Sequence, residues 1–484
     1  MNRYLLFLLC VPMLGICQTQ LGQKIEGKTG TDAFGRSVSI SSDGSIIAVG
    51  APNNDDNGSN AGHVRVYSNV AGTWTQVGDD ITGEASGDGS GESISLSADG
   101  SIIAIGAPFN DGGGADSGHV RVFKNVSGSW TQIGNDIDGD NQLDKCGWSV
   151  DLSADGNIVA VGSWEGDGNG NKSGQVRVFE NINGIWTQIG SDIYGLQPGH
   201  GIGVSVSLSS DGKILAAGAN EHPSSIGDSD YTMIFENISG TWTQIGQTIY
   251  GGADLSGRTV SLSSDGNIVA IGSLNGGGNL QGYVRVYENI AGTWAQIGSD
   301  IIGESPLDQS GRVSLSADGT IVAIGADGND GNGNASGHTR VYQNVSNTWS
   351  QVGIDIDGEE ALDLFGGSVS ISGSGSTLIV GATTPTSTNF KNGYAKVYDL
   401  SGVLSSNKFT KANFNIYPNP ASDVLNISLE NNEILEKVTI YNNLGQKIKI
   451  VRQNTVDIST LAKGLYFVEV TTNKGKASKK VIVE

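Results

Sequence analysis

Cationic side chains are scarce in this 484-residue chain, which has 28 Lys and Arg against 50 Asp and Glu. The formal net charge is −22. Proteins that bind nucleic acid neutralise phosphates with Lys and Arg, so this balance argues against nucleic acid as a partner. Proline is also rare, at 9 residues, and the glycines follow no G-x-y period, which excludes a collagen-like chain.

Cysteine is limited to Cys10, Cys17 and Cys146. The first two lie in or at the edge of a predicted targeting segment, so Cys146 would be alone in the mature chain and no internal disulfide could form. No paired base is evident in the sequence. We therefore interpret Cys146 as a small apolar side chain rather than a nucleophile.

Long apolar runs are absent too, and no transmembrane span is predicted. Residues 1–17 are predicted to be a signal peptide: Arg3 supplies the positive charge, and the apolar stretch to Met13 is too short to cross a bilayer. Gly15 and Cys17 occupy positions −3 and −1 of a cleavage site. The alternative is a lipoprotein signal in which Cys17 is lipidated.

Glycine, by contrast, is abundant at 73 residues, roughly twice its usual share. Much of it belongs to an internal repeat. Two short phrases, G-x-V-R-V-Y and S-[SA]-D-G, return along the chain with variations. A third, W-x-Q-[IV]-G, recurs at intervals of 52 to 56 residues, beginning at Trp74, Trp130, Trp186, Trp242, Trp294 and Trp349. A period in this range is typical of repeat architectures and propellers.

Each copy of the repeat contains four short β-type runs, which in the first copy are Ser37–Ser41, Ile46–Gly50, His63–Tyr67 and Trp74–Ile81. Seven copies of about 55 residues fill residues 18–400. The predicted fold class is all-β, with a seven-bladed β-propeller of four-stranded blades over residues 18–400. The last copy lacks its fourth strand, and residues 19–25 carry a similar phrase, so we expect the N-terminal segment to complete the last blade.

The repeats resemble FG-GAP repeats, which form the propellers of integrin α-subunits and of many bacterial surface proteins. The first copy carries both parts of that name, Phe34-Gly35 and Gly50-Ala51-Pro52. Gly106-Ala107-Pro108 and Phe365-Gly366 repeat one part each, whereas the other copies keep only Gly-Ala or Gly-Ser.

The C-terminal segment differs in composition. Residues 401–484 hold 11 Lys and Arg against 7 Asp and Glu, whereas residues 1–400 hold 17 against 43. After a predicted linker at 401–412, residues 413–484 resemble the C-terminal sorting domain of the type IX secretion system through Tyr417-Pro418-Asn419-Pro420, Leu444-Gly445-Gln446 and Gly464-Leu465-Tyr466. The resemblance implies a small β-sandwich, contact with the type IX secretion machinery, and export from a Bacteroidota-type bacterium to the outer surface or the medium.

Residues that recur at one position of the repeat are interpreted as scaffold. This applies to the six tryptophans above and to His63, His119 and His338, which Gln175 or Tyr283 replaces in other copies. Five arginines are each followed fifteen residues later by an aspartate, which predicts a repeated Arg–carboxylate bridge. The pairs are Arg65 with Asp80, Arg121 with Asp136, Arg177 with Asp192, Arg285 with Asp300, and Arg340 with Asp355.

The long loops between the second and third strands, and the connections between blades, should lie on one face of the propeller. Acidic residues are concentrated in these segments, and variable loops on a rigid scaffold are common binding sites. Three loops place oxygen-bearing side chains at alternate positions, as calcium loops do. The candidate Ca²⁺ ligands are Asn53, Asp55 and Asn57; Asp167, Asn169 and Asn171; and Asp330, Asn332 and Asn334. The alternative is that these residues serve only the geometry of tight turns.

Function is predicted from these features together. We expect a secreted or cell-surface binding or adhesion propeller, without catalytic activity, that recognises a glycan, matrix or protein partner. The alternative is a secreted polysaccharide-acting enzyme, a hydrolase or a lyase, on the same scaffold. His200, Glu221 and His222 fall in loops around the fourth copy and are a further candidate cluster for a metal or for acid–base chemistry.

Overall fold

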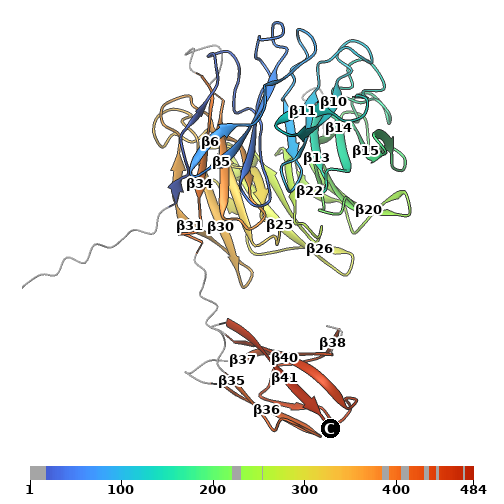
Figure 1. Ribbon diagram of the computed structural model, residues 1–484, viewed down its shortest axis with the longest axis vertical. Helices are drawn as coiled ribbons and strands as arrows, with labels where there is room; N and C mark the ends of the chain where they lie inside the picture. The colour runs from blue at the N-terminus through green and yellow to red at the C-terminus, as the bar shows by residue number, and fades with distance from the viewer. Residues whose placement is uncertain are drawn as a thin grey trace, which may run out of the picture. The chain divides into compact units, whose positions relative to one another are not determined.

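The computed structural model describes residues 18–220, 230–252, 254–383, 392–404, 414–429, 435–442, 446–472 and 475–484 (Figure 1). The predicted signal peptide and most of the predicted linker lie outside these ranges, as do Glu221 and His222. The chain separates into two compact units, Met1–Leu404 and Ser405–Glu484.

The described residues of the first unit form seven antiparallel sheets of four or five strands, in agreement with the predicted all-β class. Each sheet corresponds to one copy of the repeat. The first strands of the sheets contact one another in a closed succession. They are β3 (Val38–Ile40), β8 (Ser93–Leu96), β13 (Cys146–Leu152), β18 (Ile202–Leu208), β23 (Ser256–Leu262), β28 (Arg312–Leu315) and β32 (Phe365–Ile371).

The second strands carry the sequence I-[IVL]-A-[VIA]-G-[AS] or a close variant, and nearly every residue in them is buried, because neighbouring sheets pack on both of their faces. A Cβ on Gly106 would lie 2.0 Å from the carbonyl oxygen of Gly147 in the next sheet, which explains why glycine recurs there. These strands are β4 (Ile46–Ala51), β9 (Ile102–Ala107), β14 (Ile158–Ser163), β19 (Ile214–Ala219), β24 (Ile268–Ser273), β29 (Ile321–Ala326) and β33 (Thr377–Ala382).

The outer strands contain the two other repeated phrases. The third strands are β5 (His63–Val70), β10 (His119–Val126), β15 (Gln175–Ile182), β20 (Asp230–Ile238), β25 (Tyr283–Ile290), β30 (His338–Val345) and β34 (Tyr394–Asp399). The fourth strands are β6 (Thr73–Gln76), β11 (Ser129–Gln132), β16 (Ile185–Gln188), β21 (Thr241–Gln244), β26 (Thr293–Gln296) and β31 (Thr348–Asp357). Short strands continue five of them: β7 (Ile81–Thr82), β12 (Ile137–Asp138), β17 (Ile193–Tyr194), β22 (Ile249–Gly252) and β27 (Ile301–Ile302). The loop Gly276–Leu280, labelled η1, precedes β25 and has positive φ angles at Gly277, Gly278 and Asn279, so it is not a regular helix.

The N-terminal segment occupies the outer edge of the last sheet. Strands β1 (Thr19–Gln20) and β2 (Ile25–Glu26) both pair with β34, with Thr19 opposite Asp399 and Ile25 opposite Ala395. In Figure 1 the blue strands β5 and β6 accordingly lie beside the orange strand β34. The beginning and the end of the repeat region therefore meet, and the edge of β34 is covered.

Hydrogen bonds between sheets repeat around the unit. The residue before the turn aspartate donates its N–H to the carbonyl of the same position in the next sheet, at 2.8 or 2.9 Å. These bonds form a circle through Ser42, Ala98, Ala154, Ser210, Ser264, Ala317, Gly373 and back to Ser42. Each of the six repeated tryptophans donates its indole N–H to a backbone carbonyl at 2.8 to 3.0 Å, the partner of Trp74 being Leu21 beside β1. These tryptophans thus join neighbouring sheets.

The second unit has two antiparallel sheets that enclose one apolar core, which includes Phe414, Leu425, Val438 and Val468. Strands form at each of the three predicted positions, around Leu425–Leu429, Lys437–Tyr441 and Tyr466–Val470. One sheet contains β35 (Phe414–Tyr417), β36 (Val424–Leu429) and β39 (Thr455–Asp457). The other contains β38 (Lys447–Val451), β37 (Leu435–Asn442), β40 (Gly464–Thr472) and β41 (Gly475–Val483).

Candidate functional site

The three predicted calcium loops are tied to the connections that lead to the next sheet. The side-chain amides of Asn57, Asn169 and Asn332 donate to the carbonyls of Gly83, Gly195 and Gly358 at 2.7 or 2.8 Å. The three asparagines thus hold two consecutive loops together on the same face. This hydrogen bonding uses their nitrogen atoms and leaves the amide oxygens as acceptors.

The aspartates of these loops also have equivalent positions. An Oδ1 atom of Asp55, Asp167 and Asp330 accepts the N–H of the residue five positions later, at 2.7 or 2.8 Å. Asp55 therefore corresponds to Asp167 and Asp330, and the first predicted triplet is offset from the others by two residues. Its Asn53 instead donates its backbone N–H to the carbonyl of Asp32, at 3.2 Å.

The third members of the other two triplets contribute backbone atoms to the loop face. The carbonyl of Asn171 accepts the N–H of Gly199, and the carbonyl of Asn334 accepts the N–H of Leu362. A calcium site in these loops stays a prediction.

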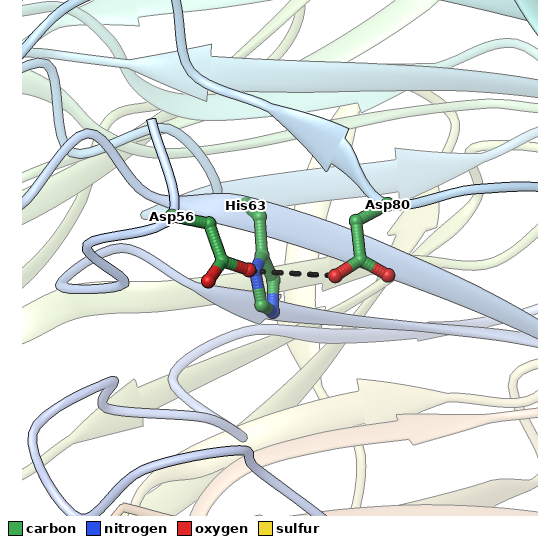
Figure 2. A group of neighbouring side chains, drawn as sticks. All are labelled: Asp56, His63 and Asp80. Atoms are coloured by element: carbon green, nitrogen blue, oxygen red, sulfur yellow. Dashed lines mark ion pairs between the residues drawn. The ribbon is translucent and has the colours of Figure 1, made fainter. Parts of the chain in front are cut away.

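A histidine between two carboxylates begins three of the third strands. His63 is fully buried, and its Nδ1 lies 3.7 Å from carboxylate oxygens of both Asp56 and Asp80 (Figure 2). Lys28 bonds to the same two carboxylates at 2.7 and 2.8 Å, and Arg65 bonds to Asp80 at 3.1 Å. His119 with Glu84 and Asp136, and His338 with Glu304 and Asp355, form similar groups, in which the first carboxylate comes from the connection before the sheet.

The electrostatics of these groups favour a neutral histidine. Burial, reinforced by the adjacent Arg65, lowers the pKa of His63 to about 4, and burial with Arg121 does the same for His119. Burial alone would raise the pKa of Asp80, but hydrogen bonds from Lys28 and Gln76 lower it to about 2. Lys or Arg side chains pair with both carboxylates in the His63 and His338 groups and with Glu84 in the His119 group, so we assign no metal to these groups.

The predicted Arg–Asp bridge is present in three of the five pairs. Arg65, Arg285 and Arg340 contact Asp80, Asp300 and Asp355 at 2.9 to 3.3 Å. The prediction is wrong for the two others, which bond to the connection that precedes them. Arg121 contacts Glu84 at 3.4 Å, and Arg177 contacts Asp140 at 2.8 Å. The spacing of fifteen residues could not reveal these partners, because they lie in the preceding copy.

Of the candidate acid–base cluster around the fourth copy, His200 lies within the described residues. His200 is buried, and its ring packs edge-on against Tyr231 at 5.4 Å between centroids. Glu221 and His222 lie outside the described residues.

The residues that break the repeat gather at one place that sequence reasoning missed. Residues 18–400 contain eight arginines, of which five belong to the repeated phrase, and eight tryptophans, of which six do. The remaining arginines, Arg36, Arg258 and Arg312, line a single cavity of about 280 Å³ together with Trp148. The last tryptophan, Trp164, packs against Trp148 in a tilted arrangement, with ring centroids 4.9 Å apart and an interplanar angle of 37°. Counting the Arg and Trp residues outside the repeated phrases would have singled out these residues, but not their proximity.

This cavity, which we call the axial mouth, lies where the first strands of the sheets begin, on the face that carries the long loops. Trp148 and Arg258 each lie at a β-bulge, where the register shifts between Cys146 and Ser149 and between Ser256 and Thr259. Bulges re-aim side chains and are frequent beside functional sites.

The three arginines of the axial mouth differ in their partners. Arg36 bonds to Glu92 at 2.6 and 2.9 Å, and Arg312 bonds to Asp327 at 3.2 Å. Arg258 forms no ion pair with any residue that the structure describes; its guanidinium lies 5.9 Å from the Trp164 ring centroid. Burial, together with the neighbouring Arg312 and Arg36, lowers the pKa of Arg258 to about 10.

A second cavity of about 360 Å³ lies deeper along the first strands, beside the circle of backbone hydrogen bonds. A serine occupies the same position in the other first strands, but Asp151 replaces it in β13. Its carboxylate accepts hydrogen bonds from the Ser95 hydroxyl at 2.8 Å and the Leu208 N–H at 2.7 Å. Burial nevertheless raises the pKa of Asp151 to about 6.

The closed succession of antiparallel sheets defines the first unit as an all-β propeller. Residues 27–67 match the FG-GAP repeat, and residues 415–484 match the secretion system C-terminal sorting domain. The chain therefore contains an FG-GAP repeat and a type IX sorting domain, and the sorting domain supports export to the cell surface or beyond. No described helix is long and apolar enough to cross a membrane.

Solved structures support the fold alone. Hydrazine synthase from Kuenenia stuttgartiensis superposes with a TM-score of 0.50 and 14% identity, over 77% of this chain and 97% of that chain. A candidate 6-phosphogluconolactonase from Bacteroides uniformis superposes with a TM-score of 0.50 and 15% identity, over 72% and 94%. No curated protein matches the chain.

Proposed function

We propose that this chain is a secreted or cell-surface propeller that binds an extracellular glycan, matrix component or protein through its long-loop face, without catalysing a reaction. The observation that carries the proposal is the convergence of the non-repeated Arg and Trp residues on the axial mouth. Scaffold positions recur from sheet to sheet, whereas a binding site for one ligand needs residues that do not. Arg and Trp are also the side chains most enriched in binding hot spots.

An array of glycans and matrix proteins probed with the purified full chain tests the proposal. We expect at least one class of immobilised partner to retain the chain at physiological salt. An array without a specific partner would contradict the proposal.

The alternative function, a polysaccharide hydrolase or lyase, requires carboxylates or other groups free to act as acid and base. Glu92, which lines the axial mouth, and Asp327, which lies beside Arg312 of its lining, are each in an ion pair with an arginine. The enzyme alternative predicts new reducing or unsaturated ends when the protein is incubated with polysaccharides. We expect none.

Calcium assistance is part of the proposal, through the loops that contain Asp55, Asp167 and Asp330. Each of these exposed aspartates has one carboxylate oxygen bound within the loop, which leaves the second oxygen for a hard cation. We expect the melting temperature of the full chain to be higher in millimolar Ca²⁺ than in excess chelator. Equal melting temperatures in the two buffers would count strongly against calcium in these loops.

A further inference from the structure

The axial mouth carries chemistry that identifies a class of ligand. We infer that it binds an acidic sugar unit, a pyranose that bears a carboxylate or a sulfate ester, with the anionic group on Arg258 and the sugar face on Trp148. This inference rests on the proposed binding function and names its ligand. It is carried by three features of the mouth: an arginine without an ion-pair partner among the described residues, a half-buried indole that lines the cavity, and a ring of hydroxyl oxygens.

The arginine provides the anion specificity. Among the described residues, the three guanidinium groups of the mouth have two carboxylates as ion-pair partners, Glu92 for Arg36 and Asp327 for Arg312, so one guanidinium group is left over. The Nε of Arg312 is buried and has no hydrogen-bond partner in the structure. An anion beside Arg258 and Arg312 would supply the missing charge and the missing acceptor. Guanidinium groups fit the planar carboxylate and the oxygen array of a sulfate through two parallel hydrogen bonds.

This positive site stands out against the charge of the molecule. The chain has a net charge of −22, and residues 1–400 hold 43 Asp and Glu against 17 Lys and Arg. All propeller arginines outside the repeated phrase nevertheless lie in this mouth. Burial and repulsion from the guanidinium groups of Arg312 and Arg36 lower the pKa of Arg258. A bound anion would offset this unfavourable environment.

The tryptophans provide a flat surface. Trp148 is half-buried, lines the cavity, and is supported from behind by Trp164 at 4.9 Å and by the edge-on ring of Phe109 at 6.5 Å. The C–H groups on one face of a pyranose pack well against the electron-rich face of an indole. A simple inorganic anion would gain nothing from this surface.

The walls of the mouth favour a ligand that donates hydrogen bonds. Ser37, Ser93 and Ser149 line the cavity, and each donates its hydroxyl proton to a carbonyl of the next sheet at 2.7 or 2.8 Å. Ser368 does the same to Gly35. A hydroxyl that already donates still has lone pairs to accept. Sugar hydroxyls supply donors for this ring, whereas an acidic peptide side chain does not.

The size of the mouth favours one sugar unit over a longer segment. Its volume of about 280 Å³ lies just below the range of roughly 300–1,000 Å³ for small-molecule pockets. A chain would therefore enter with one acidic residue, either at its end or as a side branch.

The test is calorimetric titration of the full chain with tetramers of glucuronate, galacturonate and mannuronate. Each uronate tetramer is compared with the tetramer of the corresponding neutral hexose and with the 6-sulfated form of that hexose tetramer. We expect at least one acidic oligomer to bind ten-fold or more tightly than its neutral counterpart. The variants Arg258→Gln and Trp148→Ala should each weaken that binding at least ten-fold. Arg285→Gln removes one propeller arginine outside the mouth and should change it less than two-fold. The melting temperature of each variant serves as the folding control.

The outcomes separate this inference from the proposed function. If the Arg258→Gln and Trp148→Ala variants both still bind the partner found on the array, the proposed binding function would hold, but the axial mouth would not be the binding site. Acetate or inorganic sulfate that binds as tightly as the sugar acids, without need of Trp148, would show an anion site and overturn the sugar assignment. Equal affinity for acidic and neutral oligomers, or a preference for acidic peptides, would overturn it as well.

Discussion

Asp151 replaces the serine that the other first strands carry at the same position, beside the second cavity. Because burial raises its pKa to about 6, the folded protein holds this proton more tightly than the unfolded chain does. Its contribution to stability is therefore complete below about pH 4 and decreases as the pH rises through 6.

We predict that Asp151→Ser, which restores the residue of the other sheets, stabilises the protein by about 1–2 kcal/mol at pH 8 and has little effect at pH 4.5. Urea unfolding at the two pH values measures the difference. An equal change at both pH values would show that the charge of Asp151 is not the cause.

The buried histidines give a pH dependence of opposite sign. Burial lowers the pKa of His119 to about 4, so the folded protein disfavours its protonation. The stability associated with a neutral His119 is present above its unfolded pKa of about 6.5 and is lost as the pH falls towards 4.

The repeat itself offers the matching substitution, because Gln175 occupies the position of His119 in the next sheet. We predict that His119→Gln loses about 1–2 kcal/mol less stability than the wild type between pH 7 and pH 5. Thermal unfolding over this range tests it, and parallel pH profiles for the two proteins would contradict it.

At the scale of elements, the arginines of the third strands connect different partners. Arg177 bonds to Asp140 at 2.8 Å and to the Asp138 carbonyl at 2.6 Å, both before its own sheet, whereas Arg285 bonds to Asp300 within its sheet. Asp192, the partner expected from the spacing, accepts hydrogen bonds from Gln188 and Tyr194 instead.

Double-mutant cycles distinguish these arrangements. We predict a coupling of about 0.5–1 kcal/mol between Arg177→Met and Asp140→Asn, and about 0.3 kcal/mol or less between Arg177→Met and Asp192→Asn. The small size follows from the 48% exposure of the Asp140 side chain. The cycle of Arg285 with Asp300 is the control for a bridge within one sheet. The reverse order of the two Arg177 couplings would contradict the structure.

The strands could be predicted because the sequence of each recurs, with variations, in several copies of the repeat. Trp130 and its five equivalents could be interpreted as scaffold from their recurrence, and each in fact donates its indole N–H to a neighbouring sheet. The register of the calcium loops was less accessible, because Asn53 and Asp55 both fit an alternating pattern and only their hydrogen bonds distinguish them.

The axial mouth shows the limit of prediction from sequence more clearly. Trp148 and Arg258 belong to sheets that are two positions apart, and they line one cavity because the first strands surround a common axis. Sequence comparison between repeats could identify both as exceptions. Only the closed arrangement of sheets shows that the exceptions meet.

The whole molecule depends on the N-terminal segment for closure. Ile25 is 5% exposed, and β1 and β2 cover the edge of β34. A chain that begins at residue 27 should lose about 3 kcal/mol or more of stability, and its uncovered strand edge should promote association.

Denaturant unfolding and light scattering measure both effects. Trp74→Phe, which removes the hydrogen bond to the Leu21 carbonyl and part of a buried ring but keeps β1 and β2, is the control and should cost about 2 kcal/mol. Full stability of the truncated chain would show that the N-terminal strands do not close the propeller.

The central claim is that the non-repeated residues of the axial mouth make this exported propeller a binding protein. The most direct measurement places the wild type and an Arg258→Gln/Trp148→Ala double variant, both as full chains, on the same array of extracellular glycans and matrix proteins. We expect a partner that retains the wild type but does not retain the folded double variant. Identical binding by the two proteins, or cleavage of the immobilised glycans, would contradict it.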